Sequence, residues 1–140
     1  AVLLAGLQVL VGAFNRLWCV EQPKAMTFLT ILWWLLCAHA LTDYVLQTDM
    51  MANRKQVKVG PRWDYLKTDP YGPWWWWMLA HGMVNGLGVL YVTQSVPLSV
   101  GEVLVHCTLD ILKSLGYLTT NQDQVGHLAS KGWWAWLAIS

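Results

Sequence analysis

The stretch Phe28–Leu46 reads FLTILWWLLCAHALTDYVL and decides the fold class. Its apolar run is long enough for an α-helix that crosses a bilayer. The polar residues His39, Asp43 and Gln47 follow one another at intervals of four, which places all three on one face of such a helix. The opposite face stays apolar and suits contact with lipid. We therefore predict a transmembrane helix over about residues 27–48 with a single polar stripe.

Three further apolar segments, at about 74–95, 98–118 and from 120 onward, repeat this arrangement of polar residues. Each holds one histidine with an acid or amide partner four residues away: His81 with Asn85, His106 with Asp110, and Asp123 with His127. Ionisable groups are expensive to bury in a membrane, so they gather at functional sites. Four such pairs in four segments indicate one shared site.

The composition favours a membrane protein of one domain, residues 1–140. Apolar residues make up 56% of the chain and charged residues 12%, whereas soluble domains are about one quarter charged. We predict an all-α fold, namely a polytopic transmembrane bundle of about four spanning helices. An N-terminal membrane or interfacial helix over about residues 1–20 would precede them. The net charge of +1 gives no case for nucleic-acid binding.

Residues 49–73 form the one substantial polar loop, with five basic residues against three aspartates. The positive-inside rule predicts that this loop is cytoplasmic, and the tryptophans at 74–77 are typical of an interfacial anchor. Lys113 and Lys131 are expected to extend to the headgroups, and Glu102 to lie at the interface. Cys19, Cys37 and Cys107 form no CxxC pair and are interpreted as small buried thiols.

A cluster of imidazoles and carboxylates suits a divalent metal, with zinc favoured over iron or manganese. A metal would also supply the positive charge that buried carboxylates need. The candidate ligands are His39, Asp43, His81, His106, Asp110, Asp123 and His127, with Gln47, Asn85 and Gln124 as supporting residues around them. Three alternatives remain open: hydrogen bonds that hold the helices together, a proton or ion path, and a bis-histidine haem.

Four motifs resemble a small membrane-protein family of bacteria and their phages, domain of unknown function 3307. They are AHALTDYVLQTDMMANRK at 38–55, LAHG at 79–82, VHCTLDILK at 105–113 and DQVGH at 123–127. The resemblance implies an integral protein of the bacterial inner membrane, often phage-associated, with no established activity. The histidines and aspartates in apolar helices also resemble those of bacterial membrane-bound metal-dependent hydrolases.

Two functions follow from these patterns as hypotheses. In the first, the chain is an enzyme in which a metal-activated water hydrolyses an amphiphilic substrate. In the second, it is a non-enzymatic membrane subunit whose polar cluster holds helices together. The expected partners are the lipid bilayer and either other membrane proteins or a second copy of the chain.

Overall fold

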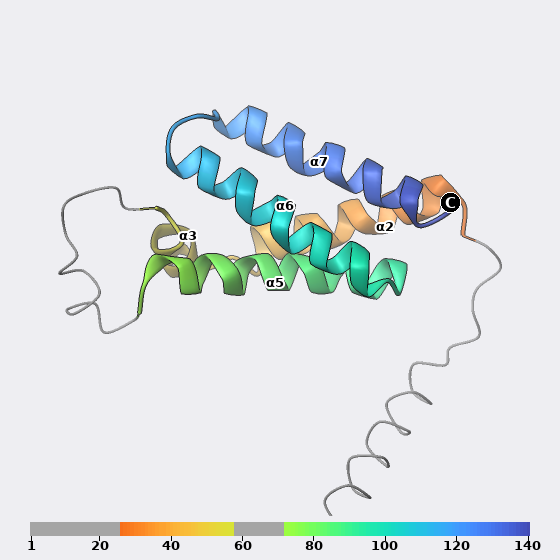
Figure 1. Ribbon diagram of the computed structural model, residues 1–140, viewed down its shortest axis with the longest axis horizontal. Helices are drawn as coiled ribbons and strands as arrows, with labels where there is room; N and C mark the ends of the chain where they lie inside the picture. Colours follow the sequence, from red (N-terminus) through yellow and green to blue (C-terminus); the bar gives the residue numbers. More distant parts are fainter. Residues whose placement is uncertain (1–25, 58–71) are drawn as a thin grey trace, which may run out of the picture.

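The computed structural model describes residues 26–57 and 72–140, all of them in helices or in the turns between helices (Figure 1). The predicted N-terminal helix and residues 58–71 of the polar loop lie outside these ranges. The elements are α2 (Phe28–Ala40), the π-helix η1 (Leu41–Val45), α3 (Asp49–Arg54), α5 (Trp74–Thr93), α6 (Val96–Ser114) and α7 (Thr120–Leu137). The predicted all-α class is confirmed.

Local sequence explains where the helices begin. Thr27, Thr48, Ser95 and Thr119 precede α2, α3, α6 and α7, and each side-chain oxygen accepts a backbone N–H of the first turn. These are preferred N-cap residues, because they satisfy amides that have no partner within the helix. Thr119 and Gln122 also form a reciprocal capping box. The turn from α6 to α7 uses Gly116 at φ +82°, a conformation open to glycine.

The four long helices surround one interior. Helix α5 packs along α6, α2 lies against both α5 and α7, and α6 lies against α7. Figure 1 shows the short helix α3 beside the beginning of α5, and the C-terminus beside the beginning of α2. Each long helix therefore presents one face to the same central space.

The interior of this bundle is more polar than its surface. Six apolar residues are buried in the described part of the chain, against twelve polar or charged ones. The outer faces carry large apolar side chains instead, such as Trp33, Leu87, Tyr91 and Leu104, each at least 60% exposed. Soluble monomers rarely expose apolar surface on this scale. The distribution of polarity is therefore the reverse of that in a water-soluble bundle.

Hydropathy alone supports one membrane span rather than the four that we predicted. Within the described ranges, Phe28–Val45 is the one segment both long and apolar enough to cross a bilayer. Helix α6 is of similar length, but Glu102, Asp110 and Lys113 lower its average hydropathy. The four-span prediction rested on segment length and gave too little weight to these inner-face charges.

The predicted continuous α-helix over 27–48 is wrong in its last third. The chain changes from α to π geometry at Leu41, and the amide of Leu46 donates to the carbonyl of Leu41 at 2.9 Å. Within this segment the hydroxyl oxygen of Thr42 lies 2.9 Å from the carbonyl oxygen of Ala38 and 2.6 Å from Asn85 Oδ1, so two acceptors compete for its one proton. Contacts of this kind with the preceding turn often bend helices. A short π-helix widens the turn and often marks a functional site. Here it carries Asp43.

The contact between α5 and α6 depends on glycine. A Cβ atom on Gly86 would lie 2.6 Å from Val103 Cγ2 and 3.1 Å from the carbonyl oxygen of Ser99. Gly86→Ala should therefore destabilise the fold by about 1–3 kcal/mol, the usual cost of overpacking. Unfolding in a mild detergent, which covers the apolar surface, measures this change.

Gly132 provides the matched control, because a Cβ there meets no atom within 4 Å. Gly132→Ala should leave stability unchanged or raise it by up to about 1 kcal/mol through helix propensity. Equal effects of the two substitutions would contradict the close α5–α6 contact.

Candidate metal centre

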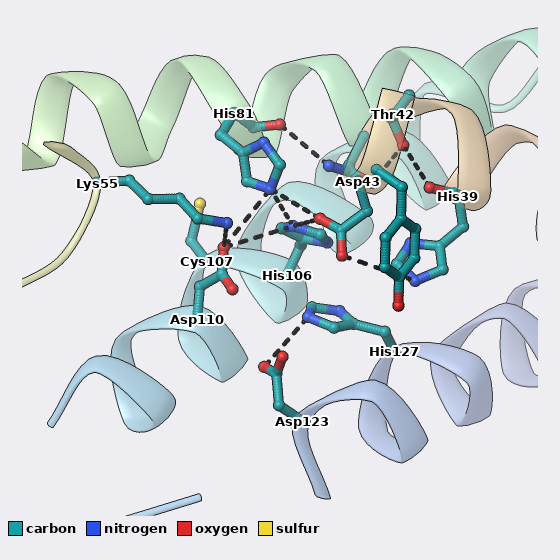
Figure 2. Close-up of polar contacts among 12 residues, drawn as sticks. His39, Thr42, Asp43, Lys55, His81, His106, Cys107, Asp110, Asp123 and His127 are labelled. Carbon is teal, nitrogen blue, oxygen red and sulfur yellow. Dashed lines mark hydrogen bonds and ion pairs between the residues drawn. The ribbon is translucent and has the colours of Figure 1, made fainter. Parts of the chain in front are cut away.

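The structure brings the four histidines into one buried cluster, as their spacing predicted. One comes from each long helix: His39 from α2, His81 from α5, His106 from α6 and His127 from α7. His106 is central, with its ring centroid 4.2 Å from that of His127 and 4.8 Å from that of His81 (Figure 2). The ring of His39 lies 5.3 Å from that of His127. None of the four is more than 4% exposed.

Three side chains from three elements point their ligand atoms at one place. The Nε2 atoms of His81 and His106 are 3.0 Å apart. Asp43 Oδ1 lies 2.9 Å from the first nitrogen and 3.5 Å from the second. Two ligands of a tetrahedral zinc, each 2.0–2.1 Å from the ion, are separated by about 3.3 Å. The triangle of Asp43, His81 and His106 therefore has the dimensions of a zinc site without rearrangement.

A second triplet, His106, Asp110 and His127, also brings three ligand atoms together. Its carboxylate, however, is already engaged by two cations. Lys55 Nζ lies 2.5 Å from Asp110 Oδ2, and Lys113 Nζ lies 3.5 Å from Asp110 Oδ1. A metal at this triplet would compete with both ammonium groups, so the first triplet is the better metal site.

Lysine side chains neutralise three of the four buried carboxylates in the described residues. The pairs are Lys55 with Asp110, Lys113 with Asp123, and Lys131 with Glu102, each at 2.5 Å. Among these four buried carboxylates, Asp43 is the one that no lysine of the described residues contacts. Its neighbours are His81, His106, the more distant His39 at 4.0 Å, and Gln124. Asp43 is thus the position at which a cation would relieve uncompensated negative charge.

Two expectations from the sequence are wrong here. Glu102 was expected at the interface, but it is fully buried and also accepts a 2.6 Å hydrogen bond from Trp134 Nε1. Lys131 was expected to reach the headgroups, but it is 1% exposed and held by Glu102. The partner that each residue finds across the bundle makes burial cheaper than extension to the surface. Lys113 is intermediate, with 30% of its side chain exposed.

The three residues predicted to support the ligands, Gln47, Asn85 and Gln124, make different contacts. Gln124 Nε2 donates to Asp43 at 3.4 Å and to Asp123 at 3.3 Å, so it links both carboxylates. Asn85 accepts a 2.6 Å bond from Thr42 and donates to the backbone of His81, which orients η1 against α5. The buried Oε1 atom of Gln47 has no hydrogen-bond partner among the described residues.

Two of the predicted ligands lie in the cluster but outside both triplets. Both ring nitrogens of His39 are buried without a hydrogen bond within the described ranges. Asp123 faces Lys113 and, at 3.3 Å, His127 Nε2. Their part in metal binding stays a prediction. The thiols of Cys37 and Cys107 are free, as interpreted from the sequence, but they are half-buried rather than buried. Cys19 lies outside the described residues.

Part of what the sequence reasoning missed was visible in the same periodicity. Glu102 stands four residues before His106, and Lys131 stands four residues after His127. Each therefore extends a polar stripe that had already been recognised. Lys55 had no such signal, because it stands among other basic residues of the polar loop. Its side chain nevertheless enters the cluster, as Figure 2 shows.

The comparisons with known proteins place the chain in a family. A family model described as "Protein of unknown function (DUF3307)" matches residues 31–130. This range includes α5 and α6, most of α2 and the first part of α7, and all residues of the cluster except Lys131. The chain belongs to this family. No curated protein and no solved structure matches it. The DUF3307 family brings no activity with it, so the function has to be argued from the cluster itself.

The pair of Glu102 and Lys131 provides a test of the buried charges. Glu102→Gln leaves the Lys131 ammonium buried without its counter-charge, which should cost about 3–5 kcal/mol. The double variant Glu102→Gln, Lys131→Met removes both charges and should recover most of that loss. Unfolding of the purified protein gives the coupling energy of the pair.

Asp49→Asn is the control for the loss of one carboxylate, because Asp49 is exposed at the beginning of α3. It should cost no more than about 1 kcal/mol. A double variant destabilised by the sum of its two single changes would mean that the pair is not coupled.

Proposed function

We propose that this protein is embedded in a bilayer and binds one divalent metal ion, zinc in the first instance, through Asp43, His81 and His106. The observation that carries the proposal is the triangle of 2.9, 3.0 and 3.5 Å between one carboxylate oxygen and two imidazole nitrogens. We further propose that the bound metal makes the protein a hydrolase of an amphiphilic substrate. The inner membrane of a bacterium is the proposed location.

The reversed polarity of the bundle supports the membrane part of the proposal. A bilayer offers apolar surroundings to the exposed leucines, valines and tryptophans, while the polar interior stays out of lipid contact. Helices α5, α6 and α7 contain 20, 19 and 18 residues. At 1.5 Å per residue each is about 27–30 Å long, close to the thickness of the hydrocarbon core. The low hydropathy of α6 and α7 reflects in part the charged residues on their inner faces, which would not contact lipid.

The number of ligands supports an enzyme rather than a structural metal site. Structural zinc has four protein ligands, whereas catalytic zinc keeps three and leaves one position for water or substrate. The preferred triplet supplies three, because Lys55 and Lys113 engage the nearby Asp110. A metal held in this way lowers the pKa of bound water and so generates a nucleophile at neutral pH.

An apolar groove beside the cluster supports an amphiphilic substrate. It has a volume of about 590 Å³ and lies between α2–η1 and α5. Leu41, Thr42 and Leu46 line it from one side, and Leu87 and Leu90 are among the residues lining the other. Asp43 belongs to the same π-helical turn as Leu41 and Thr42. An acyl chain in this groove would bring the remainder of a lipid close to the triplet.

A second function, that of a non-enzymatic membrane subunit, is favoured by one specific observation. Three lysine–carboxylate pairs join different elements: Lys55 follows α3 and reaches α6, while the other two join α6 to α7. Such pairs hold helices in register even without a metal. In this alternative the Nε2 atom of His81 makes a hydrogen bond with either Asp43 or His106. The apolar outer surface then packs against other membrane proteins or a second copy.

Cysteine labelling tests the membrane proposal. Leu104 and Tyr117 are 65% and 74% exposed, one in the middle of α6 and the other in the turn after it. In a background without the native cysteines, Tyr117→Cys should react with a water-soluble maleimide in permeabilised membranes. Leu104→Cys should react only after detergent denaturation, because lipid covers it. Equal labelling of both in intact bilayers would contradict the proposal.

Metal analysis of the purified protein tests the proposed centre. The protein prepared without chelator should carry about one zinc per chain. His81→Ala and His106→Ala should each lose most of it, because each removes one of three ligands. His39→Ala is the matched comparison, since it removes a buried histidine of the same cluster that lies outside both triplets. Zinc retained by this variant would place His39 outside the ligand set, and zinc lost from it would add His39 to that set. A folded protein without stoichiometric metal would favour the subunit alternative instead.

A further inference from the structure

Lys55 reaches the cluster from the segment that follows the short helix α3. It follows α3, at the end of a segment that also contains Arg54 and Met50. Its side chain is 8% exposed, and its ammonium contacts Asp110 Oδ2 at 2.5 Å. That same oxygen lies 3.6 Å from the Nε2 atoms of both His81 and His106. The ammonium group therefore stands directly beside the proposed metal site, as Figure 2 shows.

The contacts of Lys55 differ from those of the other two lysines. Lys131 meets a carboxylate that Trp134 also binds, and Lys113 bridges two aspartates. Lys55 Nζ has one hydrogen-bond acceptor, Asp110, among the described residues. An ammonium group has three N–H donors. Each of the three lysines makes one such hydrogen bond and keeps N–H groups to donate. Lys55 differs in position, because its acceptor oxygen on Asp110 is the one that lies 3.6 Å from the Nε2 atoms of His81 and His106.

The charge of the loaded site favours an anion. A divalent ion bound by the single carboxylate of Asp43 and two neutral imidazoles leaves an excess of one positive charge. The Lys55–Asp110 pair adds none. In surroundings of low dielectric constant an excess charge of this kind needs a counter-charge close by. An anionic oxygen would supply this counter-charge by binding at the open position of the metal or at the ammonium group of Lys55.

We propose that Lys55, held in place by Asp110, forms with the metal a subsite for the phosphate group of an amphiphilic substrate. Phosphate suits such a site because one oxygen can bind the metal while a second accepts from the lysine. Lysine is a common phosphate ligand in proteins. The assignment rests on the proposed metal centre and names the class of substrate for it.

Cobalt-loaded protein in detergent provides the test, because the visible spectrum of Co²⁺ responds to a new ligand. Inorganic phosphate should change the wild-type spectrum in a saturable manner. Lys55→Met should weaken phosphate binding by about tenfold or more, the usual effect of losing a charged hydrogen bond. Lys55→Arg keeps the charge and donors and should stay within about threefold of wild type.

Lys113→Met is the matched control, since it removes another lysine that contacts Asp110 but lies on the far side of that carboxylate. It should change phosphate affinity by less than about threefold. If Lys55→Met does not fold, the double variant Lys55→Met, Asp110→Asn removes both charges of the pair and should show the same loss of phosphate affinity.

Two lipids distinguish the source of the phosphate. Dihexanoyl phosphatidic acid binding more tightly than inorganic phosphate would identify a lipid headgroup, and equal affinities would identify free phosphate. Dihexanoylglycerol, which has no phosphate, should leave the spectrum unchanged. A spectral change with dihexanoylglycerol, or equal phosphate affinity in wild type and Lys55→Met, would overturn the subsite while leaving the metal centre intact. Failure to bind stoichiometric cobalt would overturn both.

Discussion

The burial of charge inside an apolar bundle is the constraint on which the rest of this structure depends. Four carboxylates, two buried lysines and a half-buried one, and four imidazoles share the space between the long helices. Removing each charge from water costs several kcal/mol unless a partner compensates for it. The helices can therefore pack in this way only if every ionised group meets its partner across the interior. That requirement fixes the rotation of each helix about its axis.

Three carboxylates meet this requirement with lysines, and Asp43 does not. Instead, Asp43 sits on the π-helical turn and faces two histidines whose nitrogens are 3.0 Å apart. Without a metal, the Nε2 atom of His81 cannot both donate to Asp43 and accept from His106, so only one of these two short contacts is a full hydrogen bond. With a metal, the same atoms become ligands, and the one carboxylate without a lysine acquires its counter-charge. The interior is thus nearly neutral everywhere except at the place where three ligand atoms converge.

The sequence revealed much of this arrangement because helical periodicity survives folding. Histidines four residues from an acid or amide predicted four polar stripes and their convergence, and each stripe does face the interior. The sequence could not reveal which side chains meet as partners across the bundle. Glu102 and Lys131 looked like surface charges, since either is compatible with an interface until its partner is known. Lys55 could not be distinguished from its basic neighbours, because its burial depends on the path of the chain after η1.

The change to π geometry at Leu41 was likewise invisible in the sequence, because the four-residue spacing of His39, Asp43 and Gln47 continues across it. The hydropathy of α6 and α7 was misjudged for a related reason, because average values mix an outer apolar face with an inner polar one. The missed π-helix and the misjudged hydropathy both depend on which neighbours surround a residue in the folded bundle. Such relationships are properties of the packed bundle rather than of any single segment.

X-ray absorption at the zinc edge tests the central claim most directly, since it reports the ligands of the metal in the intact protein. The proposed site predicts a four-coordinate ion with two imidazole nitrogens and a carboxylate oxygen at about 2.0–2.1 Å, and one further light atom. A six-coordinate shell of oxygens without imidazole scattering, or a shell that contains sulfur, would contradict binding by His81, His106 and Asp43.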